Sequence, residues 1–350
     1  MVSRKVLMIS TDYYGTEKSI ARAFERNGVE TILVNSRMNS WERIMSKLTR
    51  LFPGTKILLN YFIKATLEKE NERYISIART LAPAFVFIVK GDSLFPETLR
   101  YFKNKLNIPS VSYQWDDPFP SFSGTAGGNA YRDGNFQQGI SYYDHVFVYD
   151  RYYVEKMLEM GINSVSYLPL AADDEIYRKA DLTREEKEKY GYDVCFVGMP
   201  YENRIDILNS LEGFNVGVFG DLWERYKDKI DGDYFKGKAS GDTVQKIYGA
   251  SKIVLNINHP QSKYGVNTRT FEIPACEAFG IFDHIEGIED LFDIGEEIVC
   301  YRSTDELKSL IRYYLDHPEE RDAIVRKGHK RVMQEHTWFD RVKKIIEVVN

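Results

Sequence analysis

The chain has 350 residues, of which 43% are hydrophobic and 28% are charged, and its formal net charge is −5. This is the composition of a globular protein, and the length exceeds one comfortable hydrophobic core, so we expect two domains. A mildly acidic chain lacks the basic footprint of nucleic-acid-binding proteins, so no nucleic acid is expected as a partner.

The cysteine pattern and the hydrophobic runs indicate the compartment. Cys195, Cys276 and Cys300 lie far apart beside apolar runs, without the spacing of a disulfide framework or a zinc site. The apolar run at residues 6–9 is too short for a signal peptide, and no run is long enough to span a bilayer. We therefore expect a cytoplasmic protein.

The opening of the chain predicts a strand, a helix and a second strand, at residues 5–10, 16–27 and 30–35. The first loop, residues 11–15, lacks the G-x-G-x-x-G spacing, so a dinucleotide fingerprint is not supported. Asp12 and Tyr13 lie in this loop, just past the carboxyl end of a strand. They are candidates to line a ligand site, and Asp12 is a candidate catalytic residue.

Residues 41–64 carry five basic side chains against the single acid Glu42, and apolar side chains recur there at helical spacing. A basic amphipathic helix can lie on an anionic membrane, which predicts a peripheral membrane contact through this segment. The alternative is a helix that packs on the first sheet with its lysines in water.

Two adjacent acids follow a predicted strand at residues 110–115. Ligands of open α/β sheets bind beyond the carboxyl ends of strands, where Asp116 and Asp117 lie. Either carboxylate is a candidate general base for an acceptor hydroxyl. The alternative is a turn cap before Pro118, since Asp-Pro turns are common. The glycine-rich stretch at 120–129 predicts a mobile lid or a disordered loop.

Further strands and helices complete a first predicted domain, at residues 68–79, 85–89, 96–106, 145–149, 152–160 and 165–168. We place the domain boundary after residue 172. A strand at 193–197 opens the second domain, and the turn that follows runs from Gly198 to Arg204. From this turn Arg204 could reach a bound phosphate.

The stretch at residues 251–280 carries the clearest site. A β-branched run at 253–257 predicts a buried strand, and a polar loop leads from it to an apolar run that contains Glu272. The loop supplies the predicted anion-binding side chains Lys263, Asn267, Thr268 and Arg269. A strand, a cationic loop and a helix N-terminus can hold phosphate, and Glu272 could accept hydrogen bonds from ribose hydroxyls. The alternative is a surface salt bridge between Arg269 and Glu272.

The remaining elements are strands near residues 281 and 298 and helices at 304–315, 318–334 and 338–349. Asp231-Gly-Asp233 has the D-x-D form that holds manganese in some glycosyltransferases, but it lies in a hydrophilic run that is typical of a solvated turn. The six histidines show no paired spacing. No metal site is predicted.

Three strings carry a resemblance to a known family. Asn267-Thr-Arg-Thr-Phe-Glu272-Ile-Pro-Ala-Cys, with Tyr313-Tyr-Leu-x-His317-Pro-x-x-Arg321 and His336-Thr337, resembles the CgeB-like group of GT-B glycosyltransferases. The resemblance covers residues 190–345 well and the first half loosely. It implies an α/β GT-B fold, with two Rossmann-like domains facing each other across a cleft: an acceptor domain at 1–172, a nucleotide-sugar domain at 173–335 and a helix at 336–350 that returns to the first domain.

The resemblance also implies residue roles. Glu272 matches the second member of an E-x7-E pair and would contact the donor ribose, while the backbone near Gly237 would pair with the nucleobase. Gly198 would lie in the same donor site. The chain departs from the family at two positions: the first member of the pair falls at Tyr264, and Glu277 stands where glycine is usual.

The predicted function is metal-independent transfer of a sugar from a nucleotide-diphosphate sugar, with UDP or TDP favoured, to a saccharide, lipid-linked or protein acceptor. Arg204, Lys263 and Arg269 would offset the charge on the leaving diphosphate, and no cofactor is expected. Two alternatives stay open: a nucleotide-sugar epimerase on the same fold, and a non-catalytic nucleotide-sugar-binding or surface protein.

Overall fold

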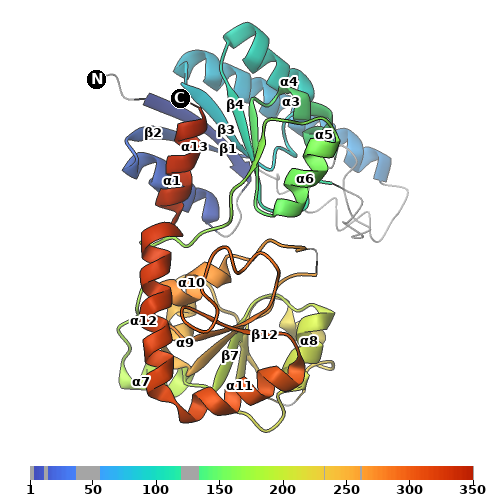
Figure 1. Cartoon of the computed structure of the whole chain (residues 1–350). Coiled ribbons are helices and arrows are strands. Elements are labelled where there is room, and N and C mark those ends of the chain that lie inside the picture. Colours follow the sequence, from blue (N-terminus) through green and yellow to red (C-terminus); the bar gives the residue numbers. More distant parts are fainter. Residues whose placement is uncertain are drawn as a thin grey trace. The chain divides into compact units, whose positions relative to one another are not determined.

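A computed structural model describes residues 4–11, 15–36, 56–119, 134–231, 233–260 and 262–349, with the side chains of 56–60 excepted. The chain divides into two compact units, Met1–Leu168 with Arg341–Asn350, and Pro169–Asp340 (Figure 1). Each unit contains one six-stranded parallel sheet with helices packed around it. The predicted α/β class with two Rossmann-like units is confirmed.

The sheet of the first unit has the order β2-β1-β3-β4-β5-β6. Its strands are β1 (Arg4–Thr11), β2 (Val29–Ser36), β3 (Phe85–Val89), β4 (Ser110–Gln114), β5 (His145–Val148) and β6 (Val165–Tyr167). Its helices are α1 (Thr16–Arg26), α3 (Lys56–Leu81), α4 (Pro96–Tyr101), α5 (Asn135–Gly139) and α6 (Arg151–Glu159). Every residue of β3 is buried, as the continuous apolar run of a central parallel strand requires.

The end of the chain belongs to the first unit. Helix α13 (Trp338–Val348) runs out of the second unit, and the residues from Arg341 onward pack with the first (Figure 1). Arg4 Nη2, at the start of β1, donates to the carbonyl oxygen of Val349 at 3.1 Å. The predicted return of the last helix to the first domain is therefore observed within this unit.

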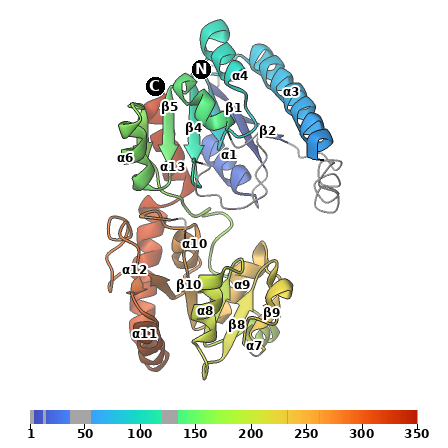
Figure 2. The ribbon, with the colours of Figure 1, turned by 90° about the vertical axis from the view of Figure 1, so that its right-hand side faces the viewer.

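The sheet of the second unit has the order β12-β11-β10-β7-β8-β9. Its strands are β7 (Val194–Val197), β8 (Val216–Phe219), β9 (Phe235–Gly237), β10 (Ile253–Asn256), β11 (Gly280–Asp283) and β12 (Val299–Tyr301). Its helices are α7 (Arg184–Tyr190), α8 (Glu202–Asn209), α9 (Asp242–Ala250), α10 (Arg269–Ala275), α11 (Thr304–Asp316) and α12 (Pro318–Glu335). Figure 2 shows α11 and α12 at the β10 side of this unit and α7 and α9 at its β8–β9 side.

The strand order of the second unit reverses between β7 and β10. Successive strands after β7 proceed toward one edge through β8 and β9, and those from β10 proceed toward the other through β11 and β12. Loops that leave the sheet in opposite directions at such a point open a crevice at the carboxyl ends of the strands. The residues that follow β7, β10 and β11 are therefore the ones positioned to meet a ligand.

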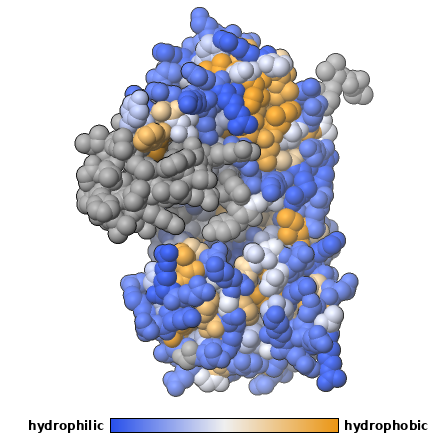
Figure 3. Space-filling model, turned by 180° about the vertical axis from the view of Figure 1, so that it is seen from behind, coloured by the Kyte–Doolittle hydropathy of each residue, from blue (hydrophilic) through white to orange (hydrophobic). Residues whose placement is uncertain are grey.

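Two elements of the second unit were not expected from the sequence. Phe235–Gly237 is an edge strand that the sequence did not predict, and Gly237 pairs in it with Phe219. Helix α7 was not predicted, although Thr183 and Glu186 form a capping box at its start, a signal that is readable from the sequence. On the face that Figure 3 shows, the second unit is mostly hydrophilic.

Candidate functional site

Glycines bring the loops after β7 and β8 together. Gly198 N–H donates to the carbonyl of Phe219 at 2.9 Å, and Trp223 Nε1 donates to the carbonyl of Gly198 at 2.7 Å. A Cβ at Gly220, whose φ is 142°, would lie 2.2 Å from the Gly198 oxygen. Only glycine permits that approach, so the backbone after β7 is held close to the neighbouring strand end.

Arg204 lies in the first turn of α8, directly after this loop, and is 2% exposed. Its Nη1 donates to the carbonyl of Met199 at 2.9 Å, while Nε and Nη2 donate to the carbonyl of Ile257 at 3.2 and 2.8 Å. Burial lowers the pKa of its guanidinium to about 9. The structure thus directs Arg204 to backbone atoms and joins the β7–α8 loop to the end of β10, whereas the sequence analysis expected it to reach a phosphate.

Arg269 has the opposite surroundings. It begins α10, is partly exposed, and its Nε donates to Asn256 Oδ1 at 3.2 Å. Its two Nη atoms have no hydrogen-bond partner among the residues that the structure describes. A guanidinium held at one nitrogen and open at the other two is suited to bidentate binding of a phosphate or carboxylate.

Asparagines surround this arginine. Asn267 Nδ2 donates to Asn256 Oδ1 at 2.9 Å and to Asn258 Oδ1 at 2.7 Å. Asn267 was predicted, but Asn256 and Asn258 were missed. The available signal was their spacing of two at the end of a predicted strand, which places successive polar side chains at the carboxyl edge of the sheet.

Glu272 lies one turn into α10 and keeps part of its surface accessible. Desolvation raises the pKa of its carboxyl group, against the opposing influence of Arg269 and of hydrogen bonds from Thr268 and Tyr177. The carboxylate in turn raises the pKa of the Tyr177 hydroxyl. Because α10 spans only seven residues, the side chains rather than a helix dipole carry the chemistry of this site.

The other residues that were predicted to bind the nucleotide have less specific surroundings. Lys263 is exposed on the loop between β10 and α10. The Gly237 carbonyl accepts a hydrogen bond from Gly220 N–H at 3.0 Å, and a Cβ at Gly237 would meet no atom within 4 Å. Among the described residues no group of three or more His, Cys, Asp or Glu side chains could hold a metal ion.

The structure shows the surroundings of the two residues that depart from the family pattern, Glu277 and Tyr264. Glu277 adopts φ 53°, the left-handed region that favours glycine, and its carboxylate pairs with Lys179 at 2.8 Å. The Tyr264 carbonyl packs against Gly287, where a Cβ would lie 2.2 Å away. The loop that carries Lys263 and Asn267 therefore rests on the loop after β11.

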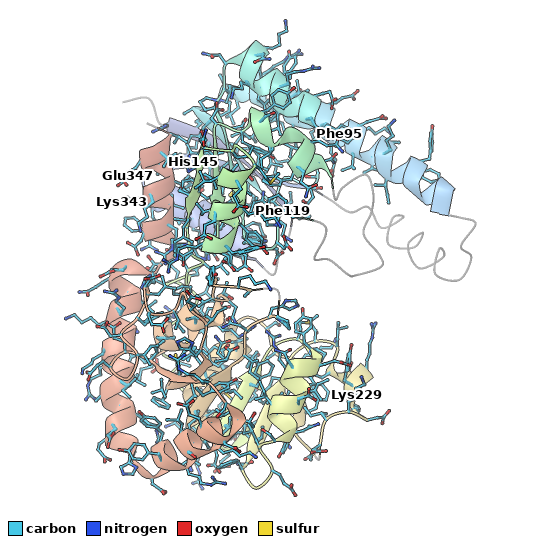
Figure 4. All side chains as sticks on the ribbon, turned by 45° about the vertical axis from the view of Figure 1, so that its right-hand side comes forward. Phe95, Phe119, His145, Lys229, Lys343 and Glu347 are labelled. Carbon is cyan, nitrogen blue, oxygen red and sulfur yellow. The ribbon has the colours of Figure 1, made fainter. Side chains whose placement is uncertain are left out.

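In the first unit, both candidate bases lie past the end of β4. Asp116 forms an ion pair with Lys90, and Asp117 Oδ1 accepts from Phe119 N–H at 2.8 Å, which is the turn-capping geometry. Burial raises the pKa of Asp117. Phe119, labelled in Figure 4, packs on α6, where its ring centroid is 5.1 Å from Lys156 Nζ. Asp12 lies outside the described residues.

Comparison with known proteins adds a family. Residues 202–347 match the family model described as glycosyl transferase-like. The matched residues cover most of the second unit and part of the last helix. Over 281 residues the chain is 23% identical to the spore protein CgeB of Bacillus subtilis. The aligned residues cover 75% of this chain and 82% of CgeB.

Solved structures share the fold of this chain. Sucrose-phosphate synthase from Thermosynechococcus elongatus has a TM-score of 0.67 at 11% identity, covering 99% of this chain and 98% of that one. HepE of Anabaena, solved in complex with UDP-glucose, has a TM-score of 0.63 at 13% identity, covering 99% of each chain. The predicted GT-B fold, the resemblance to CgeB and the enzyme class, a glycosyltransferase, are confirmed.

Proposed function

We propose that this glycosyltransferase moves a hexosyl group from a UDP- or TDP-sugar to a hydroxyl of a saccharide, lipid-linked or protein acceptor, without a metal ion. The proposal rests on the surroundings of Arg269. It is held at Nε by Asn256 at the carboxyl end of the sheet, and both Nη atoms are open among the described residues. That geometry matches a diphosphate.

The second unit supplies the donor contacts in this proposal. Arg269 binds the diphosphate bidentately, and Lys263 adds positive charge from the same loop, so that the charge on the leaving group is offset as it develops. Glu272, in its charged form, accepts hydrogen bonds from ribose hydroxyls beside Thr268. The complex of HepE with UDP-glucose supports a UDP-sugar as donor. We leave Arg204 out of this set because its donors are directed to the backbone.

The first unit supplies the base for an acceptor hydroxyl, with Asp117 or Asp116 in that role. The hydroxyl oxygen bonds to the anomeric carbon, and the bond from that carbon to the diphosphate oxygen breaks, with its electron pair leaving on the diphosphate. The base takes the hydroxyl proton. Desolvation keeps the pKa of Asp117 above its ordinary value, which strengthens it as a proton acceptor.

The test begins with donor binding. A thermal-shift screen with UDP-, TDP-, GDP- and CMP-sugars should single out one nucleotide, because a ligand that binds only the folded state raises its melting temperature. Calorimetry then gives its affinity, and transfer to acceptors is measured with and without EDTA. A melting temperature that no nucleotide sugar raises would refute the donor site, and transfer abolished by EDTA would refute metal independence.

We also propose a cytoplasmic location with peripheral contact to an anionic membrane through residues 41–64. Most of that segment lies outside the described residues, but its end carries Tyr61 and Phe62, which are 68% and 49% exposed at the start of α3. Among the described residues no helix is long and apolar enough to cross a membrane. Exposed aromatic side chains beside basic residues suit a lipid surface.

Co-sedimentation with vesicles tests this contact. The protein should sediment with phosphatidylglycerol vesicles, and much less with phosphatidylcholine vesicles, in low salt. The double variant Tyr61→Ser, Phe62→Ser should lose part of that binding while its melting temperature is retained. Equal sedimentation with both lipids, or none with either, would count against the proposal.

A further inference from the structure

A continuous line of hydrogen bonds connects the end of β11 to Arg269. Asp283, the last residue of β11, accepts from Asn258 through both oxygens: Oδ2 from the backbone N–H at 2.8 Å and Oδ1 from Nδ2 at 3.0 Å. Asn258 Oδ1 accepts from Asn267 Nδ2 at 2.7 Å, and Asn267 Nδ2 also donates to Asn256 Oδ1 at 2.9 Å. Asn256 Oδ1 accepts from Arg269 Nε at 3.2 Å.

The two ends of this line determine the direction of every amide within it. A carboxylate can only accept and a guanidinium can only donate. Because Asn258 gives its Nδ2 to Asp283, its Oδ1 must face Asn267, which also gives its backbone N–H to that oxygen at 3.0 Å. Asn256 then presents Oδ1 to Arg269 and donates Nδ2 to Thr270 Oγ1 at 3.0 Å.

Two asparagines of this line are buried, and burial keeps its geometry from changing. Asn256 is 0% exposed and Asn258 is 5% exposed, so a reversed amide would leave buried donors facing each other without water to separate them. Asparagine in place of Asp283 could present either its oxygen or its nitrogen to Asn258. The carboxylate therefore excludes the reversed arrangement from the β11 end of the line, as the Asn267 N–H and the Arg269 guanidinium, which can only donate, do from the other side.

We infer that Asp283 is a positioning residue of the diphosphate site: acting through Asn258, Asn267 and Asn256, it fixes the orientation in which Arg269 meets an anion. The identity of the ligand rests on the proposed function. The coupling between Asp283 and Arg269 rests on the described hydrogen bonds alone. It gives a role to a carboxylate whose described hydrogen bonds run to Asn258.

The groups that face Asp283 fix its charge state. Desolvation raises its pKa to about 6, while the Asn258 N–H, Arg204 and Arg269 favour the charged form. From β12, the Tyr301 hydroxyl and the Cys300 thiol face it, and the pKa of each is raised in part by this carboxylate. Asp283 therefore protonates as the pH falls through about 6, and the group that orders the amides becomes neutral.

A thermodynamic cycle without ligand tests the coupling. Asp283→Asn and Asn256→Ser are made singly and together, and unfolding in urea gives their equilibrium constants. Asn256 is chosen because it is uncharged, so direct electrostatics with Asp283 cannot imitate the effect. The effects of the two changes should be non-additive by about threefold or more, and the same cycle with Glu286→Gln, an exposed acid on the adjoining loop, should be additive. Additivity of the Asp283 and Asn256 changes would overturn the inference.

Ligand binding gives the second test. The probe is UDP-glucose, or TDP-glucose if that sugar raises the melting temperature more; neither has the terminal phosphate that titrates near pH 6. The affinity of the wild type should fall by about tenfold between pH 7.5 and pH 5, while that of Asp283→Asn should be low and should fall less over this range, because Glu272, whose pKa is also raised by desolvation, still titrates. The Glu286→Gln control should follow the wild type.

These results separate the inference from the proposed function. If no nucleotide sugar binds the wild type, the proposed function fails, and the urea cycle alone still decides whether Asp283 orders the amides. If a nucleotide sugar binds and Asp283→Asn has the affinity and the pH profile of the wild type, the positioning role is wrong while the donor site stands.

Discussion

At the residue scale, Arg269 offers the most direct test of the donor site. Its single described hydrogen bond is the one to Asn256, so Arg269→Ala should change the melting temperature little. Loss of a charge-assisted contact should weaken nucleotide-sugar binding by about 1.5 to 3 kcal/mol. Calorimetry against the variant Arg326→Ala, an exposed arginine on α12, provides the comparison. Equal affinities in the two variants would remove Arg269 from the site.

Arg204 should respond in the reverse manner. It is buried and donates three hydrogen bonds to the carbonyls of Met199 and Ile257. Arg204→Ala leaves those carbonyls without donors, so we expect a loss of roughly 3 kcal/mol or more in the free energy of unfolding, measured in urea. A variant as stable as the wild type but unable to bind nucleotide sugar would restore the sequence-based role at the phosphates.

The titration of Asp283 should appear in stability as well as in binding. Its folded-state pKa, about 6, lies above the ordinary value of 3.8, so the folded state binds the proton more tightly than the unfolded chain does. That contribution is complete below about pH 4 and is lost as the pH rises through about 6. Between those limits the stability of the wild type relative to Asp283→Asn should fall by about 3 kcal/mol. A constant difference across urea titrations from pH 4 to pH 7.5 would contradict the shift.

The sequence could nominate these polar residues but could not assign their partners. Asn267, Arg269 and Glu272 were predicted because they follow a strand and are close in sequence. In the sequence Arg204 and Arg269 look equivalent. Only the packing of the β7–α8 loop against the end of β10 shows that Arg204 is buried and bound to backbone carbonyls, whereas the Nη atoms of Arg269 are open among the described residues. Asp283 was missed because its partner, Asn258, is 25 residues away and meets it only once β10 and β11 pair.

At the element scale, the loop from β10 to α10 depends on a glycine in the next loop. A Cβ at Gly287 would lie 2.2 Å from the Tyr264 carbonyl oxygen, so the backbone that carries Lys263 and Asn267 must shift in Gly287→Ala. We expect a loss of about 1 to 3 kcal/mol in stability and weaker nucleotide-sugar binding. Gly249→Ala on α9 is the matched control, because its Cβ would meet atoms at 3.5 Å or more. If the two variants bind equally well, the loop does not rest on Gly287.

Elements with strong local patterns were predicted to the residue, and those decided by pairing were not. The strand Phe85–Val89 has the predicted bounds because it is a short apolar run between turn residues. The edge strand at Phe235–Gly237 has no such pattern, and its strand conformation comes from its ladder with β8. Residues 102–106 were predicted as part of an α-helix, but they widen into a π-helical turn that ends at Asn107, where φ is 54°.

At the scale of the whole molecule, the candidate donor residues and the candidate bases belong to different units. Arg269 and Glu272 lie in Pro169–Asp340, whereas Asp116 and Asp117 lie in Met1–Leu168. The sequence anticipated two α/β units because strands and helices alternate along the chain. It follows that donor binding and transfer should be separable by mutation, one in each unit.

The variants Asp116→Asn and Asp117→Asn test this separation. Asparagine can still cap a turn, so the hydrogen bond from Phe119 N–H can be kept and folding should survive, as melting temperatures would record. If one of the two is the base, its variant should bind nucleotide sugar normally and lose about 10²- to 10⁴-fold in single-turnover transfer.

The pH dependence distinguishes the two carboxylates. Because burial raises the pKa of Asp117, wild-type transfer should decline as the pH falls through that raised value if Asp117 is the base, since the base must be ionised to accept a proton. Because the affinity for the nucleotide sugar is itself expected to fall with pH through Asp283, transfer is measured at a saturating concentration of nucleotide sugar, where weaker donor binding does not lower the rate. Transfer within about threefold of the wild type in both variants would leave the two aspartates as turn residues and make Asp12→Asn the next variant to measure.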